Sequence, residues 1–280
     1  MTISLKVPGN PSAPARLAAP FTLITGGKGG VGKTALCASL GVHLARAGAR
    51  VLACDLDLGL ANLNVVLGLG TRGTIEDALA GRTSLRECVV RGSDDLGGLD
   101  VLVASSGAEH MGRLTGEDRA RLLSGLDELS RDYDVVLGDS AAGIGPDVLA
   151  FAAIADRVLV VTTADLAALT DAYGLIKALD QFAERTGGDV PTPEIVVNLA
   201  SSVEEAKAIA AKMRLICERF LARSPREAGW LPRSARVAAA VGARRPFAGG
   251  PPGGLEGLCL RRIAARVASR GPLPGLGVPA

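Results

Sequence analysis

Two of the six lysines in this 280-residue chain lie five positions apart in one glycine-rich segment, which reads GGKGGVGKT from Gly26 to Thr34. Its last eight residues fit the pattern G-x-x-x-x-G-K-[ST], in which successive backbone N–H groups surround phosphate oxygens. Glycine is needed there because the chain must approach the phosphates closely. Lys33 would add a positive charge between the β- and γ-phosphates, and the Thr34 hydroxyl would bind Mg²⁺. The segment therefore predicts a site for a nucleoside triphosphate.

The same glycines also satisfy the dinucleotide-binding pattern G-x-G-x-x-G, and Asp55 lies near the distance expected for a ribose contact. Two features favour the phosphate loop instead. The pair Lys33-Thr34 follows the last glycine directly, and a later apolar run ends in Asp139, an acid suited to hold Mg²⁺ through water. A glycine-rich turn that binds no ligand is the remaining alternative.

Lys28 needs an explanation of its own, because it lies inside the glycine segment. A second cation close to Lys33 is unfavourable unless an anion is present to offset their repulsion. A phosphate, bound either by the same chain or by a facing one, would supply that anion.

Short apolar runs alternate with amphipathic stretches along the chain. This alternation predicts an α/β fold: a doubly wound, mostly parallel sheet with helices on both faces. We expect strands at 21–25, 51–54, 100–103, 135–137, 158–161 and 195–197, and helices at 33–47, 117–130, 165–185, 203–221 and 255–270. Residues 1–20 are rich in Pro, Ala and Ser and are expected to form a disordered arm. Residues 21–270 then form a single domain and 271–280 a flexible tail.

Composition excludes several classes of protein. Hydrophobic residues make up 48% of the chain, enough for a packed core. No apolar run is long enough for a transmembrane helix, and residues 1–20 lack the apolar core of a signal peptide. The five cysteines are scattered without a CxxC pair, which argues against a disulfide framework or a zinc site. We therefore expect a cytoplasmic protein.

Charge is uneven along the chain. Residues 201–280 carry 14 Lys or Arg and 5 Asp or Glu, whereas the rest of the chain is net acidic. The basic part could face lipid or nucleic acid, or simply be solvated. In the last helix, Arg262, Arg266 and Arg270 fall close to the apolar stripe. A helix docked on the sheet is therefore favoured, and peripheral contact with the inner face of the cell membrane stays open.

The glycine segment resembles the deviant Walker A motif of the MinD/ParA class of P-loop ATPases, with KGGVGKT at 28–34. The stretch DLDLGLANLN at 55–64 resembles the block that follows the second strand in that class, and Asp139 matches its Walker B acid. Within the class, YDVVLGDSAAGI at 133–144 and LTDAYGLIK at 169–177 are similar to the flagellar-number regulators of the FlhG (FleN) group. The resemblance covers about 21–269.

The resemblance implies a mechanism and a set of site residues. ATP and Mg²⁺ would be the cofactors, and ATP would favour a face-to-face homodimer that hydrolyses ATP slowly. Lys28 would reach the partner's nucleotide, Asp57 would orient the attacking water, and Lys33 and Asp139 would complete the catalytic set. Mg²⁺ would be held, partly through water, by Thr34, Asp55 and Asp139. The nucleotide-binding residues would be Gly27, Lys28, Gly29, Gly30, Val31, Gly32, Lys33, Thr34, Ala35 and Asn198.

Alternatives remain at two of these positions and for the biological role. Asp55 could instead cap a helix or loop, and Asp57 could be structural. The resemblance implies control of flagellar number or placement, with the GTPase FlhF or a flagellar transcription regulator as a partner. Residues 1–20 lack the D-Q-A-x-x-L-R segment often directed at FlhF. The rival roles are a partition-type ATPase that binds DNA, a membrane-associated cell-division ATPase, a scaffold that does not hydrolyse ATP, and an ATP-dependent ligase or kinase.

Overall fold

The structure is a computed structural model that describes residues 16–106, 114–188, 190–221, 223–248 and 254–268. Its centre is an eight-stranded sheet with the strand order β3-β4-β2-β5-β1-β6-β7-β8. The strands are β1 (Phe21–Gly26), β2 (Val51–Leu56), β3 (Val89–Arg91), β4 (Asp100–Leu102), β5 (Val135–Ala142), β6 (Arg157–Thr162), β7 (Glu194–Ala200) and β8 (Arg226–Pro232).

The helices of the described residues follow the strands in the alternating order expected of a doubly wound fold. They are α1 (Lys33–Arg46), α2 (Leu63–Val66), α3 (Ile75–Leu79), α4 (Gly116–Ser130), α5 (Pro146–Ile154), α6 (Leu166–Thr186), α7 (Val203–Phe220), α8 (Ala235–Gly242) and α9 (Leu255–Val267), with a short 3₁₀ turn at Asp94–Leu96.

Neighbouring strands are parallel except at one edge, where β3 runs antiparallel to β4. The expected fold class is therefore confirmed. Strand β1 lies between β5 and β6, and the chain order of the strands reverses at this place in the sheet. Ligands of open parallel sheets bind at such a switch point, beyond the carboxyl ends of the strands. The glycine segment begins at this end of β1.

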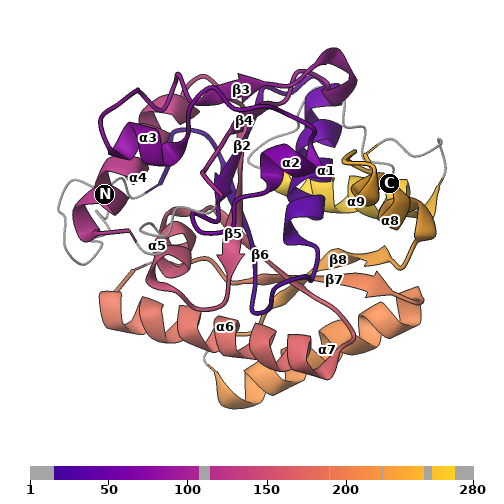
Figure 1. Cartoon of the computed structure of the whole chain (residues 1–280). Helices are drawn as coiled ribbons and strands as arrows, with labels where there is room; N and C mark the ends of the chain where they lie inside the picture. Colours follow the sequence, from indigo (N-terminus) through magenta and orange to yellow (C-terminus); the bar gives the residue numbers. More distant parts are fainter. Residues whose placement is uncertain (1–15, 107–113, 189, 222, 249–253, 269–280) are drawn as a thin grey trace.

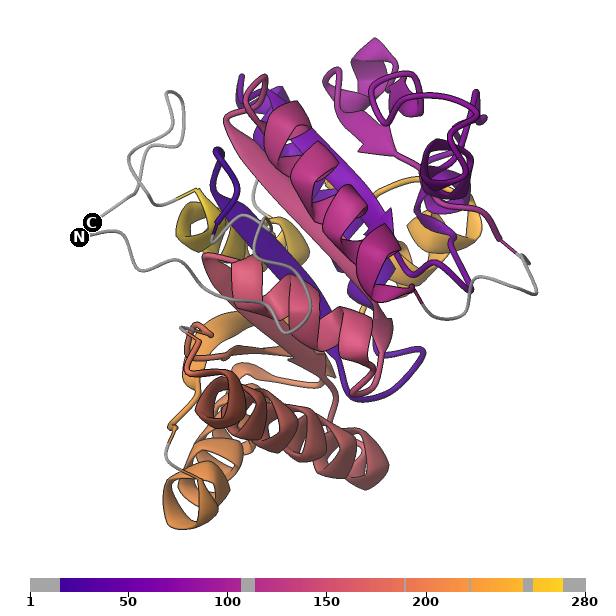
Figure 2. The same cartoon turned by 90° about the vertical axis from the view of Figure 1, so that its left-hand side faces the viewer.

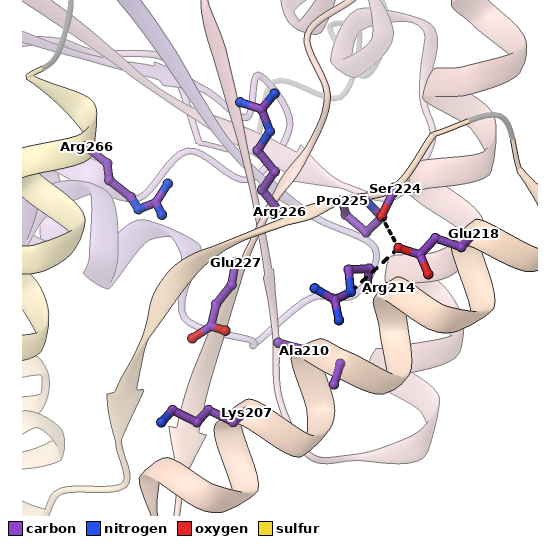
Figure 3. Close-up of a pocket in the computed structure, with 10 residues that line it drawn as sticks. Lys207, Ala210, Arg214, Glu218, Ser224, Pro225, Arg226, Glu227 and Arg266 are labelled. Atoms are coloured by element: carbon purple, nitrogen blue, oxygen red, sulfur yellow. Dashed lines mark hydrogen bonds and ion pairs between the residues drawn. The ribbon is translucent and has the colours of Figure 1, made fainter.

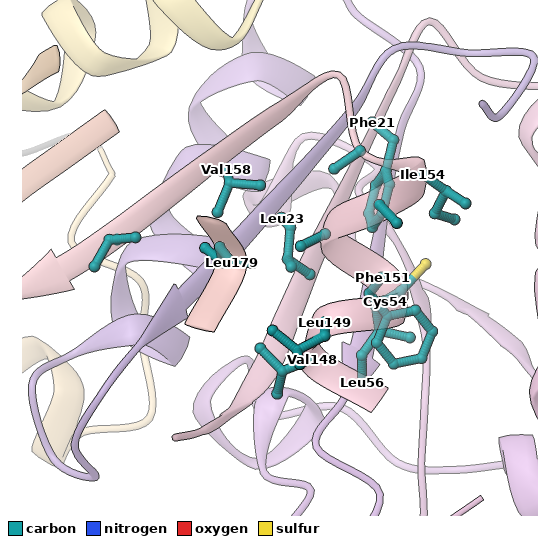
Figure 4. Packing of buried hydrophobic residues seen from close by; sticks show 14 of the residues in the cluster. Phe21, Leu23, Cys54, Leu56, Val148, Leu149, Phe151, Ile154, Val158 and Leu179 are labelled. Atoms are coloured by element: carbon teal, nitrogen blue, oxygen red, sulfur yellow. The ribbon is translucent and has the colours of Figure 1, made fainter. Parts of the chain in front are cut away.

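Successive residues of each strand face opposite sides of the sheet, so the core has two halves. Leu23 and Phe151 belong to the half covered by α4, α5, α6 and α7, which Figure 4 shows in part. Ile24 and Leu137 belong to the half covered by α1 and α9. Figures 1 and 2 show α6 and α7 side by side along one border of the molecule.

The six expected strands are all present, and several of them are longer than expected. Strand β5, for example, extends from Val135 to Ala142 and carries Asp139 within it. Strands β3 and β8 and helices α2, α3, α5 and α8 were not predicted. Helix α5 escapes notice because seven of its nine residues are buried, so it shows no polar face and no period.

The last residues of the expected N-terminal arm pack on the domain. Leu17 and Ala19 are buried in the core. The backbone N–H of Ala18 donates to Asp127, and that of Ala19 donates to Ser130. The prediction of a disordered arm is therefore wrong for residues 16–20. The rest of the expected arm, 1–15, and the expected tail at 271–280 lie outside the described residues.

Helix α9 is docked on the sheet, beside α1 and β8. Five of its residues, including Ile263, are buried. Its Arg266 donates to the buried carboxylate of Glu194 on β7, which also accepts from Arg157 on β6. The described helices include none that is both long and apolar enough to cross a membrane.

Truncation of the core beneath β1 and β5 should destabilise the fold. Phe151 on α5 is fully buried, so we expect Phe151→Ala to lower the free energy of unfolding by about 3–5 kcal/mol, the usual cost of such a cavity. Phe220→Ala, at a ring that is 64% exposed, should cost less than about 1 kcal/mol. Urea unfolding followed by circular dichroism measures both. Equal costs would contradict the assigned packing.

Candidate nucleotide-binding site

The glycine segment forms a loop between β1 and α1, at the switch point of the sheet. Gly32 is the N-cap of α1, with φ 95°, and Gly30 also has a positive φ of 77°. Residues other than glycine rarely adopt this backbone conformation. The loop therefore delivers its N–H groups and the positive end of the α1 dipole to one place, as an anion site requires.

The loop is pressed so closely against its neighbours that some positions cannot hold a side chain. A Cβ atom at Gly27 would lie 2.1 Å from the backbone of Asp171 on α6, and one at Gly26 would lie 2.8 Å from the carbonyl oxygen of Val161 on β6. Gly29 and Gly30, by contrast, face open space. The base of the loop is thus fixed by packing, while its outer part is open to a ligand.

Asn198, at the end of β7, braces the loop from the other side. Its side-chain amide donates to the carbonyl oxygen of Val31 at 2.8 Å, and its Oδ1 accepts from the N–H of Leu199 at 2.9 Å. A Cβ atom at Gly32 would lie 2.2 Å from the Asn198 amide nitrogen. Leu199 has a positive φ of 57°. The expected adenine contact of Asn198 stays a prediction; the observed contact is with the phosphate loop.

Neighbouring strands bring the expected acids together. Asp55 on β2 is in register with Asp139 on β5, and Asp139 is in register with Ile24 on β1. Both carboxyl groups are buried, as is the side chain of Lys33. Burial raises the pKa of Asp139 to about 7, although a hydrogen bond with Thr34 and the charge of Lys33 both lower it. Burial likewise raises the pKa of Asp55 to about 6, against three backbone hydrogen bonds that lower it.

Asp55 organises the loop that follows β2. Its carboxylate accepts from the N–H groups of Asp57 at 3.2 Å, Asn62 at 2.9 Å and Leu63 at 2.8 Å. Leu63 is the first residue of α2, so Asp55 does act as a loop and helix cap. Asp57 lies at the half-exposed mouth of this loop and accepts from the N–H of Leu60 at 3.2 Å. A metal-binding role for Asp55 and a water-orienting role for Asp57 stay predictions.

The residues present fit a magnesium nucleotide. Oδ1 of Asp139 is buried and has no hydrogen-bond partner among the described residues, and the same side chain is bonded to Thr34. A carboxylate and a hydroxyl oxygen are ligands that Mg²⁺ prefers. No group of three or more potential metal-ligating side chains occurs in the described part of the chain. Mg²⁺ would therefore be held jointly by these two oxygens, water and phosphate.

Lys28 lies at the exposed tip of the loop, away from the buried Lys33. Its ammonium group is 2.8 Å from Oδ2 of Asp165, and both side chains are about half exposed. The hydrogen bond and charge of Asp165 raise the pKa of Lys28. The same carboxylate caps α6 by accepting from the N–H of Ala168 at 3.0 Å.

The structure thus brings together most of the expected residues and adds others. The loop from Gly27 to Ala35, Asp139, Asp55 and Asn198 share one end of the sheet. The pairing of Asp165 with Lys28 was not predicted, although Asp is a typical N-cap residue and Asp165 lies directly before α6. The packing of Asp171 over Gly27 could not be found from the sequence, because the two lie far apart in it.

Comparison with known proteins agrees with this geometry. Residues 22–191 match the family described as "AAA domain". The chain is 36% identical over 251 residues to the antiactivator FleN of Pseudomonas aeruginosa, covering 90% of this chain and 86% of that protein. It is 40% identical over 166 residues to the flagellum site-determining protein YlxH of Helicobacter pylori. This match covers 56% of this chain and 52% of that protein.

Solved structures give the same fold. The cell-division ATPase MinD of Pyrococcus furiosus superposes with a TM-score of 0.73 at 22% identity, over 90% of this chain and all of that one. MinD of Pyrococcus horikoshii, solved with Mg-ADP, superposes with a TM-score of 0.72 at 21% identity. The superposition covers 90% of this chain and 97% of that one.

A mostly parallel sheet has a phosphate loop at its switch point, and this loop carries one exposed lysine, Lys28, and one buried lysine, Lys33. These features define a P-loop ATPase of the MinD/ParA family, and the chain belongs to this family. ATP and Mg²⁺ are accordingly its cofactors. Within the family, the similarity along nearly the whole chain is to the flagellar FlhG/FleN group.

The buried carboxyl of Asp139 should make stability depend on pH. Its pKa is higher in the folded protein than in the unfolded chain. Between about pH 4 and pH 7 the folded state therefore keeps a proton that the unfolded chain has already lost. Stability of the protein free of nucleotide and Mg²⁺ should therefore fall as pH rises through this range. Asn cannot ionise, so Asp139→Asn should become more stable relative to wild type between pH 5 and pH 8, by about 2–3 kcal/mol.

Urea unfolding in EDTA at both pH values measures this difference. Asp132→Asn, at an exposed side chain paired with Arg86, is the control and should show no comparable trend. If the difference in free energy of unfolding between wild type and Asp139→Asn were the same at pH 5 and pH 8, a raised pKa of Asp139 would be contradicted.

Proposed function

We propose that the chain is an ATP-dependent dimerisation switch that regulates the number or placement of flagella. ATP binding brings two copies face to face, and slow hydrolysis separates them. The observation that carries this proposal is the position of Lys28. It is a second cation, at the exposed tip of a phosphate loop that already contains Lys33.

The residues around the loop suit a second copy of the chain. Four large apolar side chains are exposed where strands end at this face: Leu60 after β2, Ile144 after β5, Leu166 after β6 and Leu199 at the end of β7. Exposed apolar groups gathered around a polar site are typical of an interaction surface. A facing copy would cover them and place its own nucleotide within reach of Lys28.

The geometry supports a division of roles within each copy. The loop N–H groups and Lys33 bind phosphates, and Thr34 with Asp139 would hold Mg²⁺, which supplies neutralisation of developing charge when bound. Asp57, at the half-exposed mouth of the site, is proposed to orient water. The braces from Asn198 and α6 hold the loop in position, so that little reorganisation is needed on binding.

Asp165 holds Lys28 within its own chain, and this contact must break before Lys28 can reach a partner. An ion pair between half-exposed groups contributes little in water, so phosphate competes with it readily. The ion pair with Asp165 therefore disfavours dimerisation slightly, and it holds Lys28 in one position until nucleotide is bound.

The relatives FleN, an antiactivator, and YlxH, a flagellum site-determining protein, support a flagellar role. A flagellar transcription regulator or the GTPase FlhF is the partner we propose. Peripheral contact with the cell membrane is a further proposal, since α9 is docked but exposes Leu255 and Leu258.

Substitution of the two paired residues should have opposite effects on dimerisation. Lys28→Ala should abolish dimer formation with Mg-ATP because the contact across the interface is lost. Asp165→Asn should favour the dimer severalfold, because the competing charge is removed while asparagine still caps α6. Sedimentation velocity over a range of ATP concentrations measures both. Lys177→Ala, an exposed lysine elsewhere on α6, is the control, and a Lys28→Ala protein that dimerises as wild type does would refute the proposal.

Loss of the Asp57 carboxylate should slow hydrolysis but spare nucleotide binding. If Asp57 orients the attacking water, Asp57→Ala should reduce the rate by about tenfold or more and leave ATP affinity nearly unchanged. Phosphate release and equilibrium binding of a fluorescent ATP analogue separate the two effects. Asp94→Ala, at an exposed carboxylate near β3, should change neither, and an Asp57→Ala enzyme with full activity would remove Asp57 from the mechanism.

A further inference from the structure

A continuous trough runs along the free edge of strand β8, away from the phosphate loop. Three hollows of about 700, 440 and 540 Å³ follow one another there. The first and second share Lys207, Glu227 and Arg266, and the second and third share Trp230 and Arg262. We call this surface the β8 trough.

Two helices form the walls of the β8 trough and an edge strand forms its floor. Helix α7 packs on one face of the sheet and α9 on the other, and β8 is the last strand in the order among the described residues. Figure 3 shows the charged end, with Lys207 and Arg214 projecting from α7, Arg226 and Glu227 from β8, and Arg266 from α9. An edge strand presents unpaired N–H and C=O groups, which an added strand can bond.

The backbone of β8 shows which groups face the trough. The N–H of Arg226 donates to the carbonyl oxygen of Pro193 at 3.0 Å, toward β7. Because alternate residues of a strand direct their backbone groups to opposite sides, those of Glu227 point to the open edge. Gly229, with φ 152°, lets α9 approach, since a Cβ atom there would lie 2.9 Å from Ile263.

The chemistry of the lining changes along the trough. At one end are exposed cations: Lys207 and Arg226 form no ion pair with any described residue, while Arg214 is paired with Glu218 at 3.7 Å. At the other end lie Trp230 and the exposed Leu255 and Leu258. Over the whole trough five cationic side chains and three carboxylates line the surface, and one of the cations, Arg266, is also paired with the buried Glu194.

We propose that the β8 trough binds an extended, acidic peptide segment of a partner protein, which adds as a strand to β8. Its carboxylates lie at the cationic end, and an apolar side chain lies against Trp230. An acidic occupant is favoured because Lys207 and Arg226, the exposed cations at this end of the trough, form no ion pair with any described residue.

This proposal does not depend on the ATPase assignment, because the trough is separate from the phosphate loop. The test selects ligands from a random 12-residue peptide library displayed on phage, using the full chain as the target. We expect selected peptides to be rich in Asp, Glu and β-branched residues. Synthetic copies should protect the Glu227 amide from hydrogen exchange.

Matched variants then locate the binding site. Lys207→Glu should weaken binding of a selected peptide by about tenfold or more, and Lys212→Glu, another exposed lysine on α7 that lies outside the trough, should not. Glu227→Pro removes the outward N–H and should abolish binding, whereas Glu227→Ala keeps it and should bind. Circular dichroism and the rate of ATP hydrolysis should match wild type in all four, which separates failure here from failure of the proposed function.

Four outcomes would overturn the proposal. The library could yield no peptide whose binding depends on Lys207, or the selected peptides could protect amides outside β8. A 20-base-pair DNA duplex could bind in a Lys207-dependent way while no peptide does, which would assign the trough to nucleic acid instead. Self-association through β8 that is lost in Glu227→Pro would assign it to a second copy.

Discussion

Close contact between the phosphate loop and its neighbours is the constraint on which the rest of the site depends. Gly27 touches the backbone of α6, Gly26 the end of β6, and Gly32 the amide of Asn198 on β7. A loop held from three sides keeps its N–H groups pointing at one place before any ligand arrives, and preorganised donors need little rearrangement on binding.

Electrostatics adds a second constraint at the same place. Lys33, Asp55 and Asp139 are each less than 10% exposed, and burying charge is costly unless it is compensated. Asp55 accepts hydrogen bonds from three backbone N–H groups, and burial nevertheless raises its pKa. Asp139 has a buried carboxylate oxygen, Oδ1, that has no hydrogen-bond partner among the described residues. A bound magnesium nucleotide would compensate these buried charges.

Much of this arrangement could be predicted from the sequence, for reasons that are local. The phosphate loop carries its own glycines and lysines, and Asp55 and Asp139 each follow a short apolar run that marks a strand. Elements without a local signal were missed. Strand β8 contains Gly229 and two charged residues and exists because β7 pairs with it, and α5 is apolar on nearly every side. The role of Asn198 was beyond reach for a similar reason, since its contact with Val31 joins residues 167 positions apart.

The two lysines of the loop now have different environments, which explains how one short segment can hold both. Lys33 is buried beside Asp139 and belongs to the site of its own chain. Lys28 is exposed and balanced by Asp165, so the repulsion between the lysines is offset by a carboxylate in place of a phosphate. If Lys28 served only its own loop, it would not need an ion-pair partner such as Asp165 that a phosphate can readily replace. The exposed pair makes sense if Lys28 must leave Asp165 for an anion outside its own chain, and the apolar side chains exposed around it mark the surface from which that anion comes.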